Sequence, residues 1–156
     1  MRWVVVFGLA SMTLTTLPGY AQEVPCGAFT LTGGSKTTDI IDLGEPGTSA
    51  GDLRIVERQL VDADGTTVGA LSGRSIILRP GGDNLPTMMG DWRIRIHDGT
   101  LVASALFDHE NTDTQTTTPV DVAIVGGTGP YRGAYGTLAI GAGDKPTYDF
   151  DISCRE

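Results

Sequence analysis

The sequence predicts an all-β protein, best accommodated by an eight-stranded antiparallel β-barrel. Apolar and polar residues alternate with period two along most of the chain beyond residue 21, and no segment shows the 3.6-residue period of a helix. The 22 glycines and 8 prolines recur between the alternating segments, where turns are needed. A charged fraction of 19% with an apolar fraction of 40% is typical of a folded domain and not of a disordered chain.

The first four expected strands cover residues 27–32, 53–61, 68–78 and 92–97. The first strand is followed by a polar, glycine-rich stretch over residues 33–51. The second and third strands alternate on either side of residues 62–65, which end in the hairpin signal Asp-Gly. The fourth begins at Trp92 and alternates cleanly up to a second Asp-Gly turn at Asp98.

The last four expected strands cover residues 101–107, 120–125, 134–140 and 148–154. A polar loop over residues 108–118 separates the fifth strand from the sixth. Short strands joined mostly by hairpin-type turns fit a closed barrel, which leaves no exposed sheet edge. Such a barrel either fills its interior with side chains or holds one small ligand. A β-sandwich is the alternative, because periodicity alone does not separate the two architectures.

Residues 1–21 have the pattern of a cleaved export signal. A positively charged start and a nearly unbroken apolar run precede small residues at Gly19 and Ala21, which favour cleavage before Gln22. A membrane anchor is the alternative, but polar residues interrupt the run before the about 18 apolar residues that a span needs. We therefore expect a signal peptide, a single domain over residues 22–156, a secreted or periplasmic location, and no membrane span after cleavage.

The two cysteines, Cys26 and Cys154, lie at the two ends of the expected mature chain. An even pair in an exported protein predicts a disulfide, and one that closes so long a loop is expected to stabilise the fold strongly. The chain has no Cys-x-x-Cys motif, and its two histidines lack metal-ligand spacing. We therefore expect neither a metal nor any other cofactor.

The charge balance excludes one class of partner. There are 19 acidic residues against 11 basic ones, which gives a formal net charge of −8. A protein that follows a phosphate backbone needs a basic stripe, and the scattered arginines here form none. Nucleic acid is therefore not an expected partner.

A glycine-rich stretch over residues 126–136 carries the most specific pattern in the chain. It joins two expected strands, no helix follows it, and it lacks the Lys-Ser/Thr pair of a phosphate-binding loop. Every fixed position of G-G-[ST]-G-x-[FY]-x-x-A-x-G is present. This pattern resembles the hallmark of the allene oxide cyclase and dirigent proteins, a superfamily of eight-stranded barrels. Its second half is more similar to the cyclase version than to the dirigent one.

A second block strengthens the resemblance. It is similar to the family's run through the second strand and its hairpin, and consists of Gly51-Asp52-Leu53, Leu60-Val61-Asp62, Val68-Gly69 and Gly73. The resemblance implies the barrel fold and an apolar small-molecule ligand inside it. It also implies cyclase- or isomerase-type activity and a homo-oligomer, which is commonly a trimer in this family.

The known catalytic residues of both branches of the superfamily are not retained. Residues 27–34 contain no carboxylate, whereas the cyclases have one on their first strand. Arg58 stands where the cyclases have Asn, Ser75 where they have Cys, and Asp121 where they have Tyr. Tyr135 stands where the dirigent proteins have Arg.

Arg58 and Asp121 form the candidate catalytic pair. Strand parity and the resemblance together point Arg58 into the barrel, and we expect Asp121 to face it from a later strand. An Arg can hold an oxygen on which negative charge develops, and a desolvated Asp can transfer a proton. The alternative is an ion pair in which the two groups only neutralise each other. Val56, Ser75 and Tyr135 are the expected ligand contacts.

Three function classes follow from these features. The first is a secreted cyclase or isomerase that acts on an apolar small molecule held in the barrel cavity. The second is a non-catalytic barrel that binds or carries an apolar ligand, which the loss of the family's acid groups favours. The third is a structural extracytoplasmic protein with a filled barrel. Fold resemblance predicts chemistry less well than it predicts fold, and we place the enzyme narrowly first.

Overall fold

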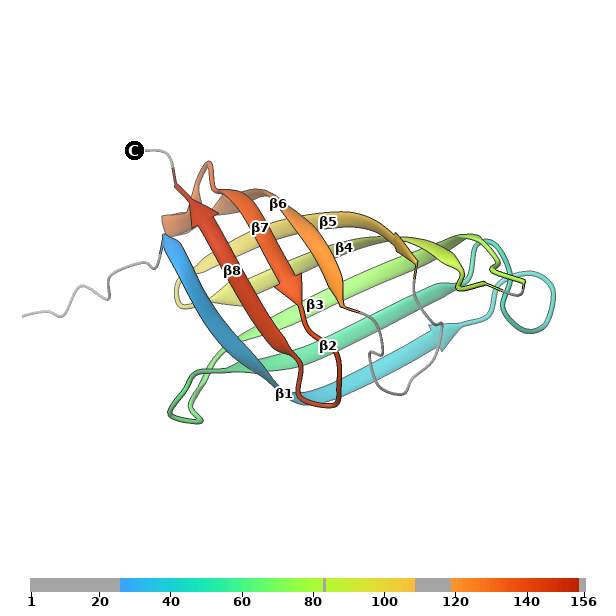
Figure 1. The fold of residues 1–156 in the computed structure, drawn as a ribbon, viewed down its shortest axis with the longest axis horizontal. Coiled ribbons are helices and arrows are strands. Elements are labelled where there is room, and N and C mark those ends of the chain that lie inside the picture. Colours follow the sequence, from blue (N-terminus) through green and yellow to red (C-terminus); the bar gives the residue numbers. More distant parts are fainter. Residues whose placement is uncertain (1–25, 83, 109–118, 155–156) are drawn as a thin grey trace, which may run out of the picture.

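Backbone hydrogen bonds join eight strands in chain order into a closed barrel (Figure 1). The structure is a computed structural model and describes residues 26–82, 84–108 and 119–154. Each strand pairs antiparallel with the next, and the eighth pairs with the first, so the predicted barrel is confirmed and the alternative β-sandwich is excluded. The strands are β1 (Gly27–Ile41), β2 (Leu53–Val61), β3 (Thr67–Arg79), β4 (Thr87–Ile96), β5 (Gly99–Asp108), β6 (Val120–Thr128), β7 (Tyr135–Ile140) and β8 (Thr147–Ser153), with a 3-10 turn, η1 (Gly129–Tyr131), after β6.

Two strands are longer than the alternation pattern predicts. β1 continues through the polar, glycine-rich stretch to Ile41, and β4 begins at Thr87, well before Trp92. A bulge between Gly33 and Lys36 bends β1, so that its N-terminal part pairs with β8 and its C-terminal part pairs with β2. In these two added segments, few side chains are both apolar and buried. The segments form strands because their backbones pair with neighbouring strands. The alternation of apolar and polar residues is therefore a weak signal for them.

Unequal strand lengths divide the barrel into two halves. β1 to β5 continue past the ends of β6, β7 and β8, toward the right in Figure 1. Among the described residues, β5 pairs with β6 only as far as Ser104 and then continues to Asp108. One half is therefore closed by eight strands, and the other is a curved wall of five. We call their junction the step; it is marked by Val120, Ile140 and Thr147, where the three short strands begin or end.

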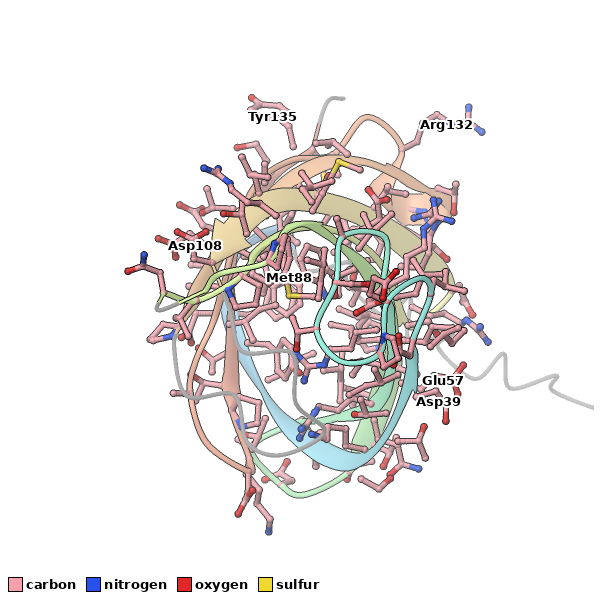
Figure 2. All side chains as sticks on the ribbon, turned by 90° about the vertical axis from the view of Figure 1, so that its right-hand side faces the viewer. Asp39, Glu57, Met88, Asp108, Arg132 and Tyr135 are labelled. Atoms are coloured by element: carbon pink, nitrogen blue, oxygen red, sulfur yellow. A yellow bond between two sulfur atoms is a disulfide. The ribbon has the colours of Figure 1, made fainter. Side chains whose placement is uncertain are left out.

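Apolar side chains fill the eight-stranded half. Alternate residues of each strand point inward, and Leu60, Ile94 and Leu138 have no exposed surface. Each such buried side chain contributes about 1.5–3 kcal/mol to the free energy of unfolding. Tyr131 of η1 packs into the same core at the end away from the step. In the five-stranded half, Met88 is fully buried and lies inside the ring of strands in Figure 2.

A disulfide joins Cys26 and Cys154, as the sequence predicts, with their Cα atoms 5.9 Å apart. The two cysteines flank β1 and β8, the strands whose pairing closes the barrel, where Gly27 lies opposite Ile152. The bridge therefore ties the start of β1 to the end of β8 at the seam of the barrel.

The Gly51-Asp52-Leu53 block has a structural role. Asp52 is 1% exposed, and its carboxylate accepts hydrogen bonds from the Ser49 amide (2.7 Å), the Leu43 amide (2.8 Å) and the Ser49 hydroxyl (3.0 Å). Its carbonyl oxygen accepts a hydrogen bond from the amide of Ile77 in β3 (3.0 Å). The bonds from the Ser49 and Leu43 amides hold the pKa of Asp52 below its ordinary value, because they favour the charged form. Asp52 therefore fastens the loop between β1 and β2 to the wall of the barrel.

We expect Asp52→Asn to destabilise the fold most at neutral pH. Because the pKa of Asp52 is lower in the folded chain than its unfolded value of 3.8, its contribution is present above that value. The contribution is lost as the pH falls through the folded pKa. Urea unfolding at about pH 6 and about pH 3 measures the free energy of unfolding of the variant and of the wild type. The difference between these two free energies should be smaller at the lower pH. Asp64→Asn, at an exposed turn position, is the control, and a gap of equal size at both pH values would contradict the assignment.

Candidate functional site

A cavity of about 70 Å³ lies at the step, against the inner faces of β2 and β3. Gly73 and Ser75 line it, at inward positions where larger side chains would fill the barrel. Pockets that enclose a whole drug-sized ligand measure about 300–1,000 Å³, whereas one water needs only about 10–15 Å³. The enclosed space therefore suits one end of a ligand.

Arg58 of β2 points into this cavity and is 5% exposed. Its Nη1 donates hydrogen bonds to the carbonyl oxygens of Asp144 (2.9 Å) and Gly34 (3.2 Å). The side chain crosses β1 over Gly33, where an added methyl group would lie 2.7 Å from Nη1 and 2.9 Å from Cδ. Glycine at this position therefore makes room for the buried guanidinium. A guanidinium has five N–H donors, so further donors stay available to a ligand.

Arg54 and Tyr148 complete the polar part of the cavity. Arg54 lies on the same face of β2 as Arg58 and is 7% exposed, and Tyr148 of β8 is 3% exposed. Burial raises the pKa of Tyr148, and the positive charges of Arg58 and Arg54 offset part of that rise. The phenol therefore keeps its proton at neutral pH and is able to donate a hydrogen bond.

Trp92 of β4 and Phe107 of β5 form an aromatic part of the lining. Their ring centroids are 5.7 Å apart with planes tilted by 40°. A methyl group added at Gly73 would lie 2.5 Å from Trp92 Cδ1, and one added at Gly90 would lie 2.5 Å from Trp92 Cη2. Both ends of the indole therefore rest on glycine backbone, and any larger residue at either position would displace the ring.

The charge of the lining is positive. Lys36 of β1 joins Arg54 and Arg58, and none of the described residues that line the cavity is acidic. Arg74 also borders it, but its side chain is 73% exposed and pairs with Asp91 at 3.6 Å. Within the ranges the structure describes, no three His, Cys, Asp or Glu side chains form a group that could hold a metal. The arrangement is chemically suited to binding and polarising an oxygen atom.

Three of the predicted site residues lie together. Arg58, Val56 and Ser75 all line the cavity, Val56 from the inward face of β2 and Ser75 from that of β3. Their predicted roles toward a ligand stay predictions.

Asp121 and Tyr135 lie outside the barrel. Asp121 is exposed between the buried Val120 and Val122, and Tyr135 is 52% exposed and points away from the barrel in Figure 2. The prediction that Asp121 faces Arg58 across the cavity is therefore wrong. Because the two side chains lie on opposite sides of the barrel wall, the alternative ion pair between them does not form either. Both faces of β6 carry apolar residues, which makes strand parity ambiguous; the face that begins with Val120 turns inward.

Arg54, Tyr148 and the aromatic pair were not predicted as site residues. Arg54 could have been found, since it lies four residues before Arg58 and therefore on the same face of the strand. Tyr148 lies two residues before Phe150 and four before Ile152, so it shares one face of the strand with these two apolar residues. This spacing predicts an inward position. Phe107 lines the cavity because β5 extends beyond the point where its pairing with β6 ends. No local signal in the sequence reveals that difference.

Comparison with known families identifies the chain. The sequence model described as "Allene oxide cyclase barrel like domain" matches residues 31–152. The chain belongs to this family. The resemblance predicted from the two sequence blocks is thus confirmed for this allene oxide cyclase-like barrel. A search of curated proteins found no match.

Solved structures of three kinds share the fold of this allene oxide cyclase-like barrel. A structure named pyocyanin demethylase is 27% identical, with a TM-score of 0.70 over 81% of this chain and 99% of its own. The Diels Alderase AbmU from Streptomyces koyangensis is 18% identical, with a TM-score of 0.61 over 82% of this chain and 64% of its own. The pterocarpan synthase dirigent protein GePTS1 is 17% identical, with a TM-score of 0.57 over 80% of this chain and 81% of its own. The two less similar structures support the fold alone.

Proposed function

We propose that this protein is a cyclase- or isomerase-type enzyme for a small, largely apolar molecule that presents an oxygen atom to Arg58. The observation that carries the proposal is the buried Arg58 guanidinium beside Arg54 and Tyr148, in a cavity otherwise lined by apolar and aromatic side chains. Hydrogen-bond donors fixed in a site of low dielectric favour a transition state in which negative charge develops on a bound oxygen. The walls of the barrel would select the folded conformation of the substrate.

The roles of the polar groups follow from their protonation. An arginine stays charged throughout, so Arg58 and Arg54 act by stabilising negative charge and not by transferring a proton. Tyr148 keeps its proton and donates a hydrogen bond to the same oxygen. Asp121, predicted as an acid or base, is exposed outside the barrel and takes no part in this scheme.

A non-catalytic binding protein is the second candidate. It is favoured by one observation: among the described residues that line the cavity, none is a carboxylate that could act as general acid or base. Such a barrel would hold its ligand at Arg58 and release it unchanged. A structural protein with a filled barrel is less well supported, because the cavity at the step leaves the barrel partly hollow.

Similarity to the pyocyanin demethylase structure supports a small-molecule substrate, since the likeness extends over 99% of that chain. Pyocyanin, the compound in the name of that structure, is therefore a first compound for assays of binding and turnover.

The deciding experiment identifies small molecules bound to the protein purified from its native host. Bound compounds are extracted and compared by mass spectrometry between the natural chain and Val56→Trp, which places a large ring in the cavity. We expect a compound that is present in the natural chain and absent from the variant. Nothing bound to either chain, with equal thermal stability of both, would overturn the proposal of a ligand cavity.

Incubation of the extracted compound and of pyocyanin with the protein then separates the two candidates. An enzyme converts one of them, and Arg58→Gln should reduce the rate by about 100-fold while binding persists, which is typical of losing a donor to a developing oxyanion. A binding protein returns both compounds unchanged. Arg93→Gln, which removes an exposed charge from the outer face of β4, is the matched control.

We also propose that the protein forms a homo-oligomer through an outer apolar row. Cross-strand pairing aligns five apolar residues on the outside of the five-stranded wall. They are Ile41, Leu53, Ile76, Met89 and Leu106. Leu106 is 67% exposed and Met89 is 45% exposed, and contiguous exposed apolar surface of this kind often marks an interface. A second copy of the chain is the occupant that the family resemblance favours.

Leu106→Asp should therefore convert the oligomer into a monomer, because a charge at this position would have to lose its water on association. Analytical ultracentrifugation measures the change in mass. Val125→Asp, another exposed apolar position but on β6, is the control and should leave the assembly unchanged. A wild-type chain that sediments as a monomer would contradict the proposed interface.

The proposed location is outside the cytoplasm, in the medium or the periplasm, after removal of residues 1–21. The disulfide between Cys26 and Cys154 supports it, because such bonds persist in oxidising compartments. In the part of the chain that the structure covers, no helix has the length and hydropathy to cross a membrane.

A further inference from the structure

We infer that the ligand carries two hydrogen-bonding oxygens, one bound by the hydroxyl of Tyr148 and the other by the hydroxyl of Ser75. This inference rests on the proposed ligand cavity and specifies the polar groups of its occupant. Both side chains are buried and line the cavity, and the described residues supply neither hydroxyl with a hydrogen-bond partner.

Ser75 is a polar residue in an apolar part of the wall. It is 7% exposed and lies on the inward face of β3, between Arg54 of β2 and Gly90 of β4. The nearest inward residues on its own strand are Gly73 and Ile77, which have no polar side-chain atom. Within the described ranges its hydroxyl neither donates nor accepts a hydrogen bond. An alanine would fill the same place without a polar atom to satisfy, so packing does not explain the hydroxyl.

Tyr148 brings a second hydroxyl to the cavity from β8. It is 3% exposed, and its hydroxyl is likewise without a hydrogen bond to any residue that the structure describes. Burial raises the pKa of Tyr148, and the positive charges of Arg58 and Arg54 lower it, so the phenol lies on the arginine side of the cavity. Its hydroxyl is therefore the group that meets the oxygen held by Arg58.

A ligand that fills the cavity removes water from both hydroxyls. The volume of about 70 Å³ has room for more than one water, and water satisfies the hydroxyls when no ligand is bound. A ligand without matching oxygens would leave both groups unpaired in a closed site, which costs more than an ordinary hydrogen bond contributes. Sites of this kind reject analogues that lack the matching oxygen. Ser75 and Tyr148 therefore determine which ligands the cavity accepts.

The two hydroxyls approach the cavity from different walls. β1 and β2 lie between β8 and β3 in the closed order of strands, and neighbouring strands are about 4.8 Å apart. This separation favours two oxygens of one molecule over a single shared oxygen. A hydroxyl both donates and accepts, so carbonyl and hydroxyl oxygens both fit, and neither position requires a charge on the ligand. The class of ligand is therefore a largely apolar diketone or hydroxyketone.

Removal of each hydroxyl should not destabilise the ligand-free chain. Ser75→Ala and Tyr148→Phe lose no hydrogen bond within the protein, so their urea unfolding midpoints should equal or exceed that of the wild type. Tyr131→Phe is the matched control, because its hydroxyl is also buried without a partner in the described part of the chain but does not line the cavity. A lower midpoint in Ser75→Ala or Tyr148→Phe would show that the hydroxyl has a structural partner and would overturn its assignment to the ligand.

Neutral ketones of one ring system test the number of oxygens by calorimetric titration of the full chain. trans-1-Decalone and trans-2-decalone carry one oxygen each. trans-Decalin-1,4-dione, -1,5-dione and -2,6-dione carry two, at different separations. We expect at least one dione to bind at least about 10-fold more tightly than both monoketones, because only a dione satisfies both hydroxyls.

The same variants locate each oxygen. Ser75→Ala should reduce the affinity for the tightest dione to that for the monoketones and leave the monoketones unaffected. Tyr148→Phe should weaken both classes, since the oxygen that they share binds there. Ser72→Ala, which removes an exposed hydroxyl from the outer face of β3, and Tyr131→Phe should change neither.

The outcomes separate this inference from the proposed function. Equal affinity of the wild type for monoketones and diones would overturn the second oxygen, and so would an equal loss for both classes in Ser75→Ala. Absence of binding by all five ketones would overturn the inference as a whole. In each of these cases the proposed function still stands if the natural protein yields a bound compound that Val56→Trp lacks.

Discussion

Removal of the Cys26–Cys154 disulfide is expected to lower the free energy of unfolding by roughly 4–5 kcal/mol. The bridge closes a loop with a sequence separation of 128 residues, and the entropy that a cross-link removes from the unfolded chain grows with loop length. A typical domain has a total stability of about 5–15 kcal/mol, so the bridge accounts for a large share of it. Urea unfolding of the double variant Cys26→Ser/Cys154→Ser measures the loss.

Two controls distinguish chain entropy from damage to the folded state. The wild-type chain in a reducing buffer should lose the same stability as the double serine variant, since both remove the cross-link by different means. The circular dichroism spectrum of the folded variant should match that of the wild type. An unchanged urea midpoint with an unchanged slope would show that the bridge contributes no stability.

Much of the fold could be predicted from the sequence, because most strands alternate in the way that a half-buried sheet requires. β2 has the predicted bounds, residues 53–61, since its alternating apolar residues coincide with its backbone pairing. The C-terminal part of β1 gave no such signal. Gly33 leaves room there for Arg58 to pass over the strand, and residues 35–39 are all polar. The C-terminal part of β1 is therefore determined by packing against residues far away in the sequence. The alternation of apolar and polar residues within the segment does not predict it.

The site was predictable only where one face of a strand is clearly the inner one. On β2, the family resemblance oriented the strand, and Arg58 and Val56 line the cavity as expected. On β6, apolar residues on both faces left the orientation open, and Asp121 lies outside. The cavity depends on the difference in length between β5 and β6, which no single segment of the sequence contains.

The glycine-rich motif that revealed the family acts through packing against Tyr131. A side chain at Gly127 or at Gly99 would collide with Tyr131, which is 1% exposed. The turn η1 therefore places a large aromatic ring where two glycines leave space, and this ring closes the end of the barrel away from the step. Its hydroxyl is buried without a hydrogen-bond partner among the described residues, and burial raises its pKa.

Tyr131→Ala should accordingly cost about 3–5 kcal/mol of the free energy of unfolding, the range found when a large buried aromatic side chain is truncated. Tyr131→Phe should be neutral, or stabilising by up to about 1 kcal/mol, because it keeps the ring and removes a buried hydroxyl that makes no hydrogen bond. Urea unfolding of both variants tests this contrast. A large loss in Tyr131→Phe would mean that the hydroxyl has a partner, and the motif would then act through hydrogen bonding as well as through packing. A small loss in Tyr131→Ala would mean that the ring contributes little to the packing at this end of the barrel, and the glycine-rich motif would then not act through packing against Tyr131.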